Sequence, residues 1–305
     1  MGIEFAKRSF VVAASFGLAS ALSVVVLGDE SGYTITTHQQ MKIATIEGMW
    51  KTEPAPASFT IFGIPDQKNL KTDYQVTVPW ALGLIATRSL DGEVKGIVEL
   101  VEEGKQRIRS GMIGYGALKN LRSPEAQESS KLTLKQHSKD LGYALLLKQY
   151  TDDVISATDS QIDQAAWDTV PRVAPLFWSF RIMVGLGFYF ILFFGFAFYV
   201  ASRGTLLSHP NFLRVAILSL PTPWIAAELG WVVAEYGRQP WTIDGILPTF
   251  LSGSGLNSSS VWITLIAFIT FYTILAVVDV LLMKKYIKLG PQQALAPKGG
   301  KAHAY

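Results

Sequence analysis

The chain alternates between long apolar runs and one long polar block. Four runs are long enough to cross a bilayer, which takes ~20 residues in a helix: residues 10–27, 173–202, 215–234 and 261–283. The block at 29–172 carries amphipathic stretches typical of short helices, and pieces at 58–65 and 74–80 that favour extended chain. The pattern predicts an all-α membrane protein of about four transmembrane helices with a large, mostly helical loop domain.

The same pattern divides the chain into four parts. In chain order these are a first transmembrane helix, a loop domain, a group of three transmembrane helices and a tail: 1–28, 29–172, 173–283 and 284–305. A signal peptide is the alternative for the first part, since Lys7 and Arg8 precede the apolar run. We disfavour it because the run is long and Gly28-Asp29-Glu30 is a poor cleavage context.

Basic residues flanking the apolar runs indicate the orientation. With four spans, the short flanks that carry them all fall on one side of the membrane: Lys7, Arg8, Arg203, Arg214, Lys284 and Lys285. By the positive-inside rule that side is the cytoplasm. The loop domain at 29–172 then faces away from the cytoplasm, and the tail at 284–305 lies within it.

Local signals predict interruptions in two of the helical stretches. Pro221 and Pro223 predict a bend in the third span, because proline lacks the amide hydrogen of the helical ladder. The glycine-spaced run at 111–116 does not fit a dinucleotide-binding fingerprint, and we interpret it as a turn or helix break.

Composition and charge exclude several function classes. Hydrophobic residues make up 49% of the chain and charged residues 17%. The net charge is only +3, which does not indicate a nucleic-acid surface. The absence of cysteine excludes disulfides, thiolate metal sites and iron–sulfur clusters within these 305 residues.

The stretch at 224–241 carries two carboxylates at or near membrane depth. On a helix Glu228, Trp231 and Glu235 share one face, which must point at protein, water or a cofactor rather than lipid. Gly237 is the expected C-cap of this helix. Three roles are open to Glu235: haem ligand, proton carrier, or partner of Arg238, and the i,i+3 pattern alone favours the ion pair.

Arg181 and Met183 lie inside the second apolar run. An arginine at this depth needs an anion, such as a carboxylate or a haem propionate. A methionine sulfur is a known axial ligand of haem iron, so the two residues together point weakly to haem. All four histidines lie outside the apolar runs, so a membrane-buried haem would take its histidine ligand from elsewhere: His38, His137, His209 and His303.

Lys42 and Glu47 follow the first span. A carboxylate beside a hydroxyl substrate can accept its proton, and a lysine can hold its oxygen. From the pattern alone, solvated surface charges are the more favoured interpretation of this pair.

Several longer stretches resemble one family, subunit I of the bacterial cytochrome bd quinol oxidase. The stretches are AKRSF, VLGDESGY, FGIPDQ, ALGLIATRS, DLGYALLLKQYT, PRVAPLFWSFRIM and GWVVAEYGRQPW. They cover nearly the whole chain, and the motif GRQPW is the most specific. The long polar block resembles the quinol-binding loop of the family in its long form.

The resemblance implies a role for each candidate residue. Met183 resembles an axial ligand of a low-spin haem b, and Glu235 resembles the axial ligand of a high-spin haem b. Lys42 and Glu47 resemble the pair implicated in quinol binding and oxidation. The remaining candidates resemble residues beside the haems: Arg181, Arg238 and Trp231.

The resemblance also implies cofactors and partners. It predicts two haems b, a haem d or third haem b, and ubiquinol or menaquinol, in a bacterial inner membrane. Only the carboxyl-terminal part of the subunit is matched, so we expect its amino-terminal part as a separate chain, oxidase subunit II, and an accessory subunit. The isolated chain is expected not to reduce oxygen. Two alternatives remain: a truncated, inactive remnant, or a non-catalytic four-span receptor or assembly protein.

Overall fold

A computed structural model describes residues 2–122 and 128–294. Four stretches in it are long and apolar enough to cross a membrane. They are α1 (Gly2–His38), α7 (Val173–Ser202), the broken pair α8 (Pro210–Leu218) and α9 (Thr222–Glu235), and α10 (Ser258–Ala294). The prediction of an all-α membrane protein with four spans is therefore confirmed.

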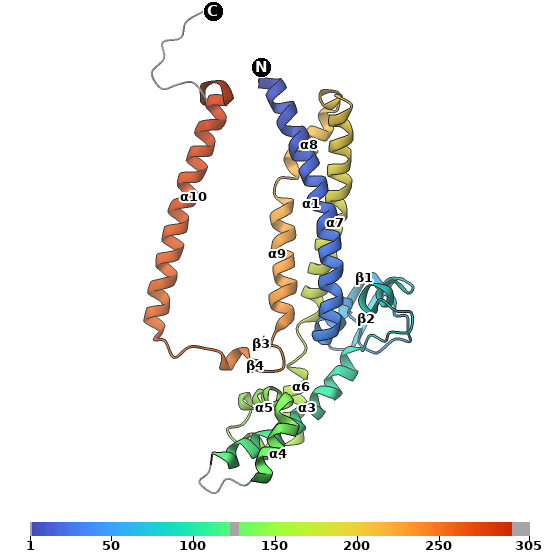
Figure 1. The fold of residues 1–305 in the computed structure, drawn as a ribbon, viewed down its shortest axis with the longest axis vertical. Helices are drawn as coiled ribbons and strands as arrows, with labels where there is room; N and C mark the ends of the chain where they lie inside the picture. Colours follow the sequence, from blue (N-terminus) through green and yellow to red (C-terminus); the bar gives the residue numbers. More distant parts are fainter. Residues whose placement is uncertain (1, 123–127, 295–305) are drawn as a thin grey trace, which may run out of the picture.

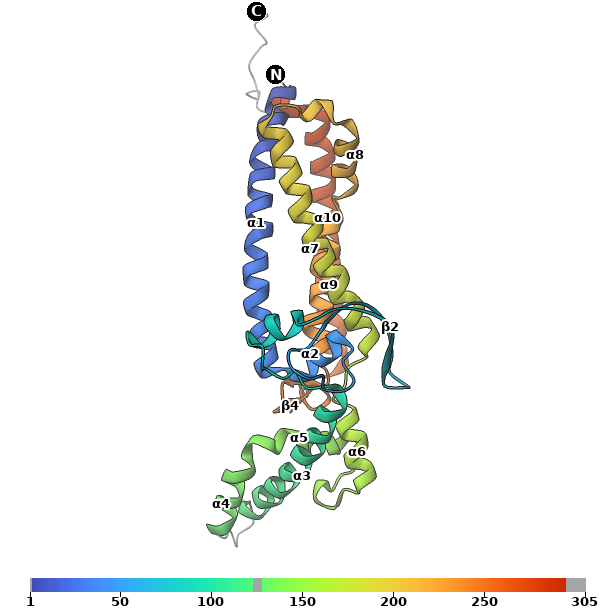
Figure 2. The ribbon, with the colours of Figure 1, turned by 90° about the vertical axis from the view of Figure 1, so that its right-hand side faces the viewer.

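The spans lie as Figures 1 and 2 show. α1 and α9 both pack along α7, whereas the side chains of α10 are exposed from Ser258 to Leu289. The chain's N-terminus, the turn before α8 and the far end of α10 lie at the end of the molecule opposite the loop domain (Figure 1). The basic flanks thus share one end, as the sequence predicts.

α1 is much longer than the apolar run that predicted it. The helix continues for about three turns beyond Leu27, up to His38. Arg88 binds this extension, because its guanidinium donates to Asp29 at 3.1 Å and to Glu30 at 2.6 Å. It also lies over the ring of Tyr33 at 4.3 Å. The polar end of α1 is therefore part of the loop domain's framework.

The third span breaks where its prolines predict. α8 ends at Leu218, and α9 begins at Thr222 with Pro223 in its first turn. The prediction that Gly237 caps α9 is wrong. The helix ends at Glu235 and tightens into a 3₁₀ turn, Tyr236–Arg238, in which Gly237 is buried against Leu176 and Lys42.

The loop domain joins helices of 6 to 25 residues to one hairpin. Its elements, in chain order, are α2 (Gln40–Glu47), β1 (Phe59–Asp66), β2 (Lys71–Val78), a π-helical turn (Gly83–Thr87), α3 (Ile97–Leu121), α4 (Glu128–His137), α5 (Leu141–Leu146) and α6 (Asp159–Trp167). β1 and β2 pair antiparallel, with irregularities between Thr60 and Ile64. The extended pieces predicted near 58–65 and 74–80 are this hairpin. The main core of the domain is apolar and lies between α3, α5 and α6.

The predicted break at the glycine run 111–116 is wrong, because α3 passes through it unbroken. The glycines serve close packing instead. A Cβ atom on Gly111 would lie 2.2 Å from the carbonyl oxygen of Asp140, and one on Gly114 would lie 3.1 Å from His137. Their absent side chains let α3 approach the segment that links α4 to α5.

The connection between α9 and α10 packs against the loop domain. It contains the short pair β3 (Trp241–Ile243) and β4 (Leu247–Pro248). The ring of Trp241 lies 5.1 Å from that of Tyr143 in α5. A Cβ atom on Gly142 would lie 2.2 Å from the carbonyl oxygen of Gly245, so the two backbones are in direct contact. This contact fixes the C-terminal end of α9 against the loop domain.

Candidate functional site

α2 carries both candidate residues of the loop domain into the interior. The helix has only two turns and ends at Gly48, whose φ of +62° places it in the left-handed region that glycine adopts without strain. Lys42 is 6% exposed and Glu47 is 3% exposed. The interpretation of this pair as solvated surface charges is therefore wrong.

Lys42 links α2 to the C-terminal end of α9. Its ammonium donates a hydrogen bond to the carbonyl oxygen of Ala234 at 3.1 Å, the residue before Glu235. Burial lowers the pKa of Lys42, and the nearby positive charge of Arg238 lowers it further; the negative charges of Asp244 and Glu235 act against this. Lys42 therefore places a buried hydrogen-bond donor beside Glu235, the candidate haem ligand.

Glu47 faces β1 and α7 instead. Its Oε2 accepts hydrogen bonds from the amide of Thr60 at 3.1 Å and from the guanidinium of Arg181 at 3.2 Å. Burial raises the pKa of the Glu47 carboxyl to about 7, although Arg181 and the Thr60 amide both act to lower it. The carboxyl group is thus poised to gain or lose a proton near neutral pH.

The guanidinium of Arg181 donates four hydrogen bonds to acceptors around Glu47. One terminal nitrogen donates to the carbonyl oxygens of Ile46 at 2.7 Å and Phe177 at 3.1 Å; the other donates to Glu47 and to the carbonyl oxygen of Thr60. Its Nε is buried and has no partner among the described residues. An arginine has five N–H donors, so one donor remains for an acceptor outside the described chain.

Met183 follows Arg181 on α7 and meets α9. A Cβ atom on Gly230 would lie 3.1 Å from the Met183 sulfur, so this glycine leaves room for the thioether between the helices. The side chain is half-buried. Met183 lies two positions after Arg181, so the two side chains leave α7 in different directions.

The acidic face of α9 is only partly covered. Glu235 forms the ion pair with Arg238 that the spacing predicts, and both side chains are half-exposed. Glu228 is exposed, and Trp231 is 63% exposed. Two members of the predicted face therefore point away from the described chain, which fits a face that meets protein or cofactor outside it.

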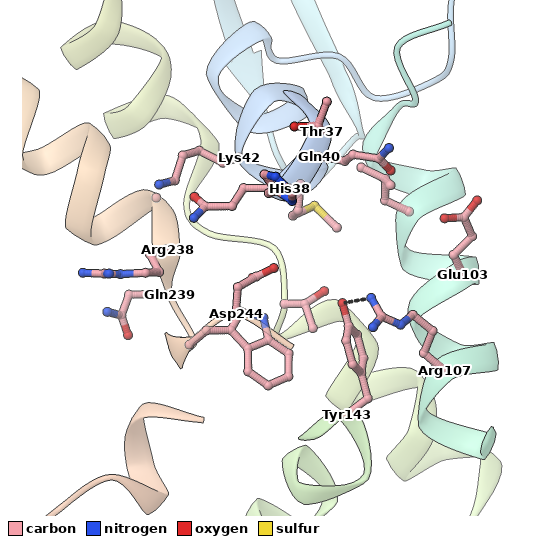
Figure 3. A pocket seen from close by; sticks show the side chains of 17 residues that line it. Thr37, His38, Gln40, Lys42, Glu103, Arg107, Tyr143, Arg238, Gln239 and Asp244 are labelled. Carbon is pink, nitrogen blue, oxygen red and sulfur yellow. Dashed lines mark hydrogen bonds between the residues drawn. The ribbon is translucent and has the colours of Figure 1, made fainter. Parts of the chain in front are cut away.

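A polar cavity of about 280 Å³ lies where the spans meet the loop domain. Figure 3 shows Asp244 in it between Lys42 and Arg107. Arg107 also donates to the hydroxyl of Tyr143 at 3.0 Å (Figure 3). Sequence reasoning missed Asp244, Arg107 and Tyr143, because no local motif marks them.

The described residues fit one side of a haem rather than both. No cluster of three or more His, Asp or Glu side chains suitable for a metal occurs in residues 2–122 and 128–294. His38 ends α1, His209 precedes α8 at the other end of the spans, and His137 binds Ser110 in the loop domain. His303 lies outside the described residues. The thioether of Met183 and the carboxylate of Glu235 would each offer one ligand to a haem iron, and the unpartnered Nε of Arg181 would suit a propionate oxygen.

Comparisons with known proteins agree along nearly the whole chain. The family model described as cytochrome bd terminal oxidase subunit I matches residues 2–291. The cytochrome bd-II ubiquinol oxidase subunit 1 of Escherichia coli is 37% identical over 286 residues, which is 94% of this chain and 56% of that protein. The cytochrome bd ubiquinol oxidase subunit 1 of Bacillus subtilis is 29% identical over 291 residues, 95% of this chain and 50% of the relative.

The fold agrees as well. The solved structure of the bd oxidase from Geobacillus thermodenitrificans superposes with a TM-score of 0.55 at 18% identity, over 93% of this chain and 56% of the other. The chain spans about half the length of the curated relatives it matches.

Proposed function

Because the chain belongs to the cytochrome bd terminal oxidase subunit I family, we propose that it takes part in oxidising quinol and passing the electrons through haems to oxygen. The observation that carries this proposal is the pair of buried ionisable residues on α2. Lys42 and Glu47 lie between the loop domain and the two helices that hold Met183 and Glu235. Quinol oxidation needs a proton acceptor and an electron acceptor near each other, and this arrangement supplies sites for both.

Glu47 is the proposed proton acceptor. A quinol releases two protons and two electrons when it becomes a quinone. The carboxylate of Glu47 takes one proton from a quinol hydroxyl, so an O–H bond breaks on the quinol and one forms on the carboxyl. Its pKa of about 7 matches this task near neutral pH. Lys42 donates a hydrogen bond to a quinol oxygen, and the second proton leaves to water.

Two residues would hold haem groups, which supply the electron acceptors when bound. Met183 is the proposed ligand of a low-spin haem b, and Glu235 of a high-spin haem b. Arg181, Arg238 and Trp231 are the proposed neighbours of these groups. For Glu235 this role requires that its carboxylate leave or share its ion pair with Arg238.

The remaining ligands and partners lie outside the described residues in this proposal. They are the amino-terminal part of subunit I, with a histidine opposite Met183 and the ligand of the third haem (haem d or b), together with oxidase subunit II and a small accessory subunit. The complex belongs to a bacterial inner membrane, with ubiquinol or menaquinol as substrate. The loop domain faces away from the cytoplasm, and consumption of cytoplasmic protons contributes to the proton motive force.

Reduced-minus-oxidised absorption spectra of membranes test the proposal. The chain is produced with and without the companion polypeptides, in wild-type form and as Met183→Leu and Glu235→Gln. We expect haem bands only with the companions, loss of the low-spin band in Met183→Leu, and loss of the high-spin signal in Glu235→Gln. Met283→Leu and Asp279→Asn, both at exposed positions on α10, are the matched controls. No haem under any condition would instead indicate an inactive remnant.

A further inference from the structure

Arg181 ties a transmembrane helix to two elements of the loop domain. Its guanidinium leaves α7 and binds the last turn of α2, through the carbonyl of Ile46 and the carboxylate of Glu47. It also binds β1 through the carbonyl of Thr60. The Arg181 and Glu47 side chains are only 7% and 3% exposed. The two charges therefore depend on each other for compensation, since water does not reach them.

We propose that Arg181 is the positioning residue of Glu47: it acts on quinol oxidation through that carboxylate, which it orients and keeps ionised, and not chiefly through a haem. This inference rests on the proposed function of Glu47. Four N–H donors of Arg181 are used on protein acceptors. Only Nε remains for a cofactor, so the cofactor contact is the minor part of what this side chain does.

The surroundings of Glu47 show why it needs this partner. Three groups act on its carboxyl: the Arg181 guanidinium from α7, the Thr60 amide from β1, and the negative charge of Glu53 from the segment after α2. Glu53 disfavours the ionised form, and so does burial. Lys42, on the same helix, points to the carbonyl of Ala234 instead and does not compensate Glu47. Arg181 is thus the single cation that directly pairs with this carboxylate among the described residues.

Geometry adds a second reason. The Glu47 carboxylate has its Oε2 held by two donors, the Thr60 amide and Arg181. Without Arg181 the carboxylate would keep only the hydrogen bond from the Thr60 amide, and it would rotate more freely about the bond that joins it to Cγ. A proton acceptor must lie within hydrogen-bond reach of the hydroxyl it serves. Loss of Arg181 would therefore change both the pKa and the orientation of the Glu47 carboxylate.

The test uses the assembled oxidase complex in membranes, with ubiquinol-1 as the probe. The variants are Arg181→Gln, Arg181→Lys, Glu47→Gln and the double variant Glu47→Gln/Arg181→Gln. Arg172→Gln, an exposed arginine one residue before α7, is the matched control. Four quantities are measured from about pH 5.5 to 9: kcat, KM, the haem spectrum, and the infrared carboxyl band that Glu47→Gln abolishes.

If Arg181 acts through Glu47, Arg181→Gln lowers kcat/KM at pH 7 at least ~30-fold, the range for truncating one member of a buried ion pair. The titration of the infrared band and the pH profile both move up by about one unit or more, because the cation that favours the carboxylate is gone. Arg181→Lys keeps the positive charge, so its kcat/KM and its pH profile should lie between those of wild type and Arg181→Gln. In the Glu47→Gln background, Arg181→Gln changes kcat/KM less than ~3-fold.

Three results would overturn the inference. One is an Arg181→Gln variant whose infrared titration matches wild type. Another is a full additional loss in the Glu47→Gln background. The third is a haem spectrum altered in Arg181→Gln while the pH profile stays fixed. A Glu47→Gln complex with wild-type quinol oxidation would instead refute the proposed function itself. If Arg181→Gln does not assemble, Arg181→Lys and the charge-free double variant still decide between these outcomes.

Discussion

The ammonium of Lys42 donates a hydrogen bond to the carbonyl oxygen of Ala234, 192 positions further along the chain. This bond joins the first helix of the loop domain to the residue before Glu235. The candidate quinol site and the candidate haem ligand of α9 are therefore parts of one hydrogen-bonded structure. Substitutions on either side should be detected on the other.

Lys42→Met tests that connection. The variant keeps the length of the side chain but removes the donor to Ala234 and the charge beside Arg238. We expect the KM for ubiquinol-1 to rise about tenfold or more, since a charged hydrogen bond contributes roughly 1.5–3 kcal/mol. We also expect a shift in the haem signal assigned to Glu235. Lys51→Met, which removes an exposed lysine just after α2, should change neither quantity; equal effects in both variants would refute a specific role for Lys42.

The pKa of Glu47 predicts how stability depends on pH. Its folded pKa of about 7 lies above its ordinary value of 4.5, so between these limits the folded state binds more protons than the unfolded state. Stability from this group is fully present below about pH 4.5 and is lost as the pH rises through 7. The loss amounts to about 3 kcal/mol at most.

Urea unfolding of the detergent-solubilised complex at several pH values measures this effect as a difference between wild type and Glu47→Gln. The difference should change in favour of the variant from about pH 5 to 7.5 and then level off. A difference independent of pH would mean that Glu47 keeps an ordinary pKa in the folded protein.

Substituting Arg238, the ion-pair partner of Glu235, distinguishes two roles of Glu235: a structural ion pair and a haem ligand. Both side chains are half-exposed, so the pair itself contributes only about 0–1 kcal/mol to stability. If the pair is merely structural, Arg238→Gln leaves the haem spectra unchanged and costs little stability. If Glu235 binds haem, Arg238→Gln shifts the high-spin signal while stability again changes by less than ~1 kcal/mol. The control is Arg203→Gln, which removes an arginine directly after the last residue of α7, at the end of that helix far from the loop domain.

The contact of Gly142 with Gly245 predicts a site where a small side chain is not tolerated. A valine at Gly142 would place its Cβ 2.2 Å from a carbonyl oxygen, so the backbones must separate. We expect a loss of about 1–3 kcal/mol, typical of overpacking, and faster proteolysis in the loop after β3. Gly116→Ala is the control, because its new Cβ would lie 3.7 Å from Ile155, an ordinary contact. Similar protease sensitivity in both variants would contradict the tight contact.

Local patterns predicted the elements whose signals lie within the chain segment itself. α7 begins and ends at the residues that bound its apolar run, because Arg172 and Arg203 flank it. The prolines at 221 and 223 placed the break in the third span correctly. These features depend on residues that are neighbours in sequence.

Features that depend on distant partners were not predicted from pattern. The burial of Glu47 requires Arg181, which is 134 positions away. The local pattern around Gly111 predicts a helix break because the packing partner of this glycine, at Asp140, lies in another element. The proposed roles of Lys42 and Glu47 follow from the resemblance to a family, whereas their burial and their partners are visible only in the structure.

The number of residues in the polar end of α1 determines where α2 begins. In an α-helix each residue adds about 1.5 Å and turns the chain by about 100°. Residues 28–38 continue α1 beyond its apolar run, so their number determines the height and direction at which the chain enters α2. Substitutions at exposed positions there should be tolerated. Deleting a single residue would rotate α2 relative to Arg88, which holds Asp29 and Glu30, and would turn Lys42 away from Ala234. Selection on this segment would then act on its length more strongly than on its composition.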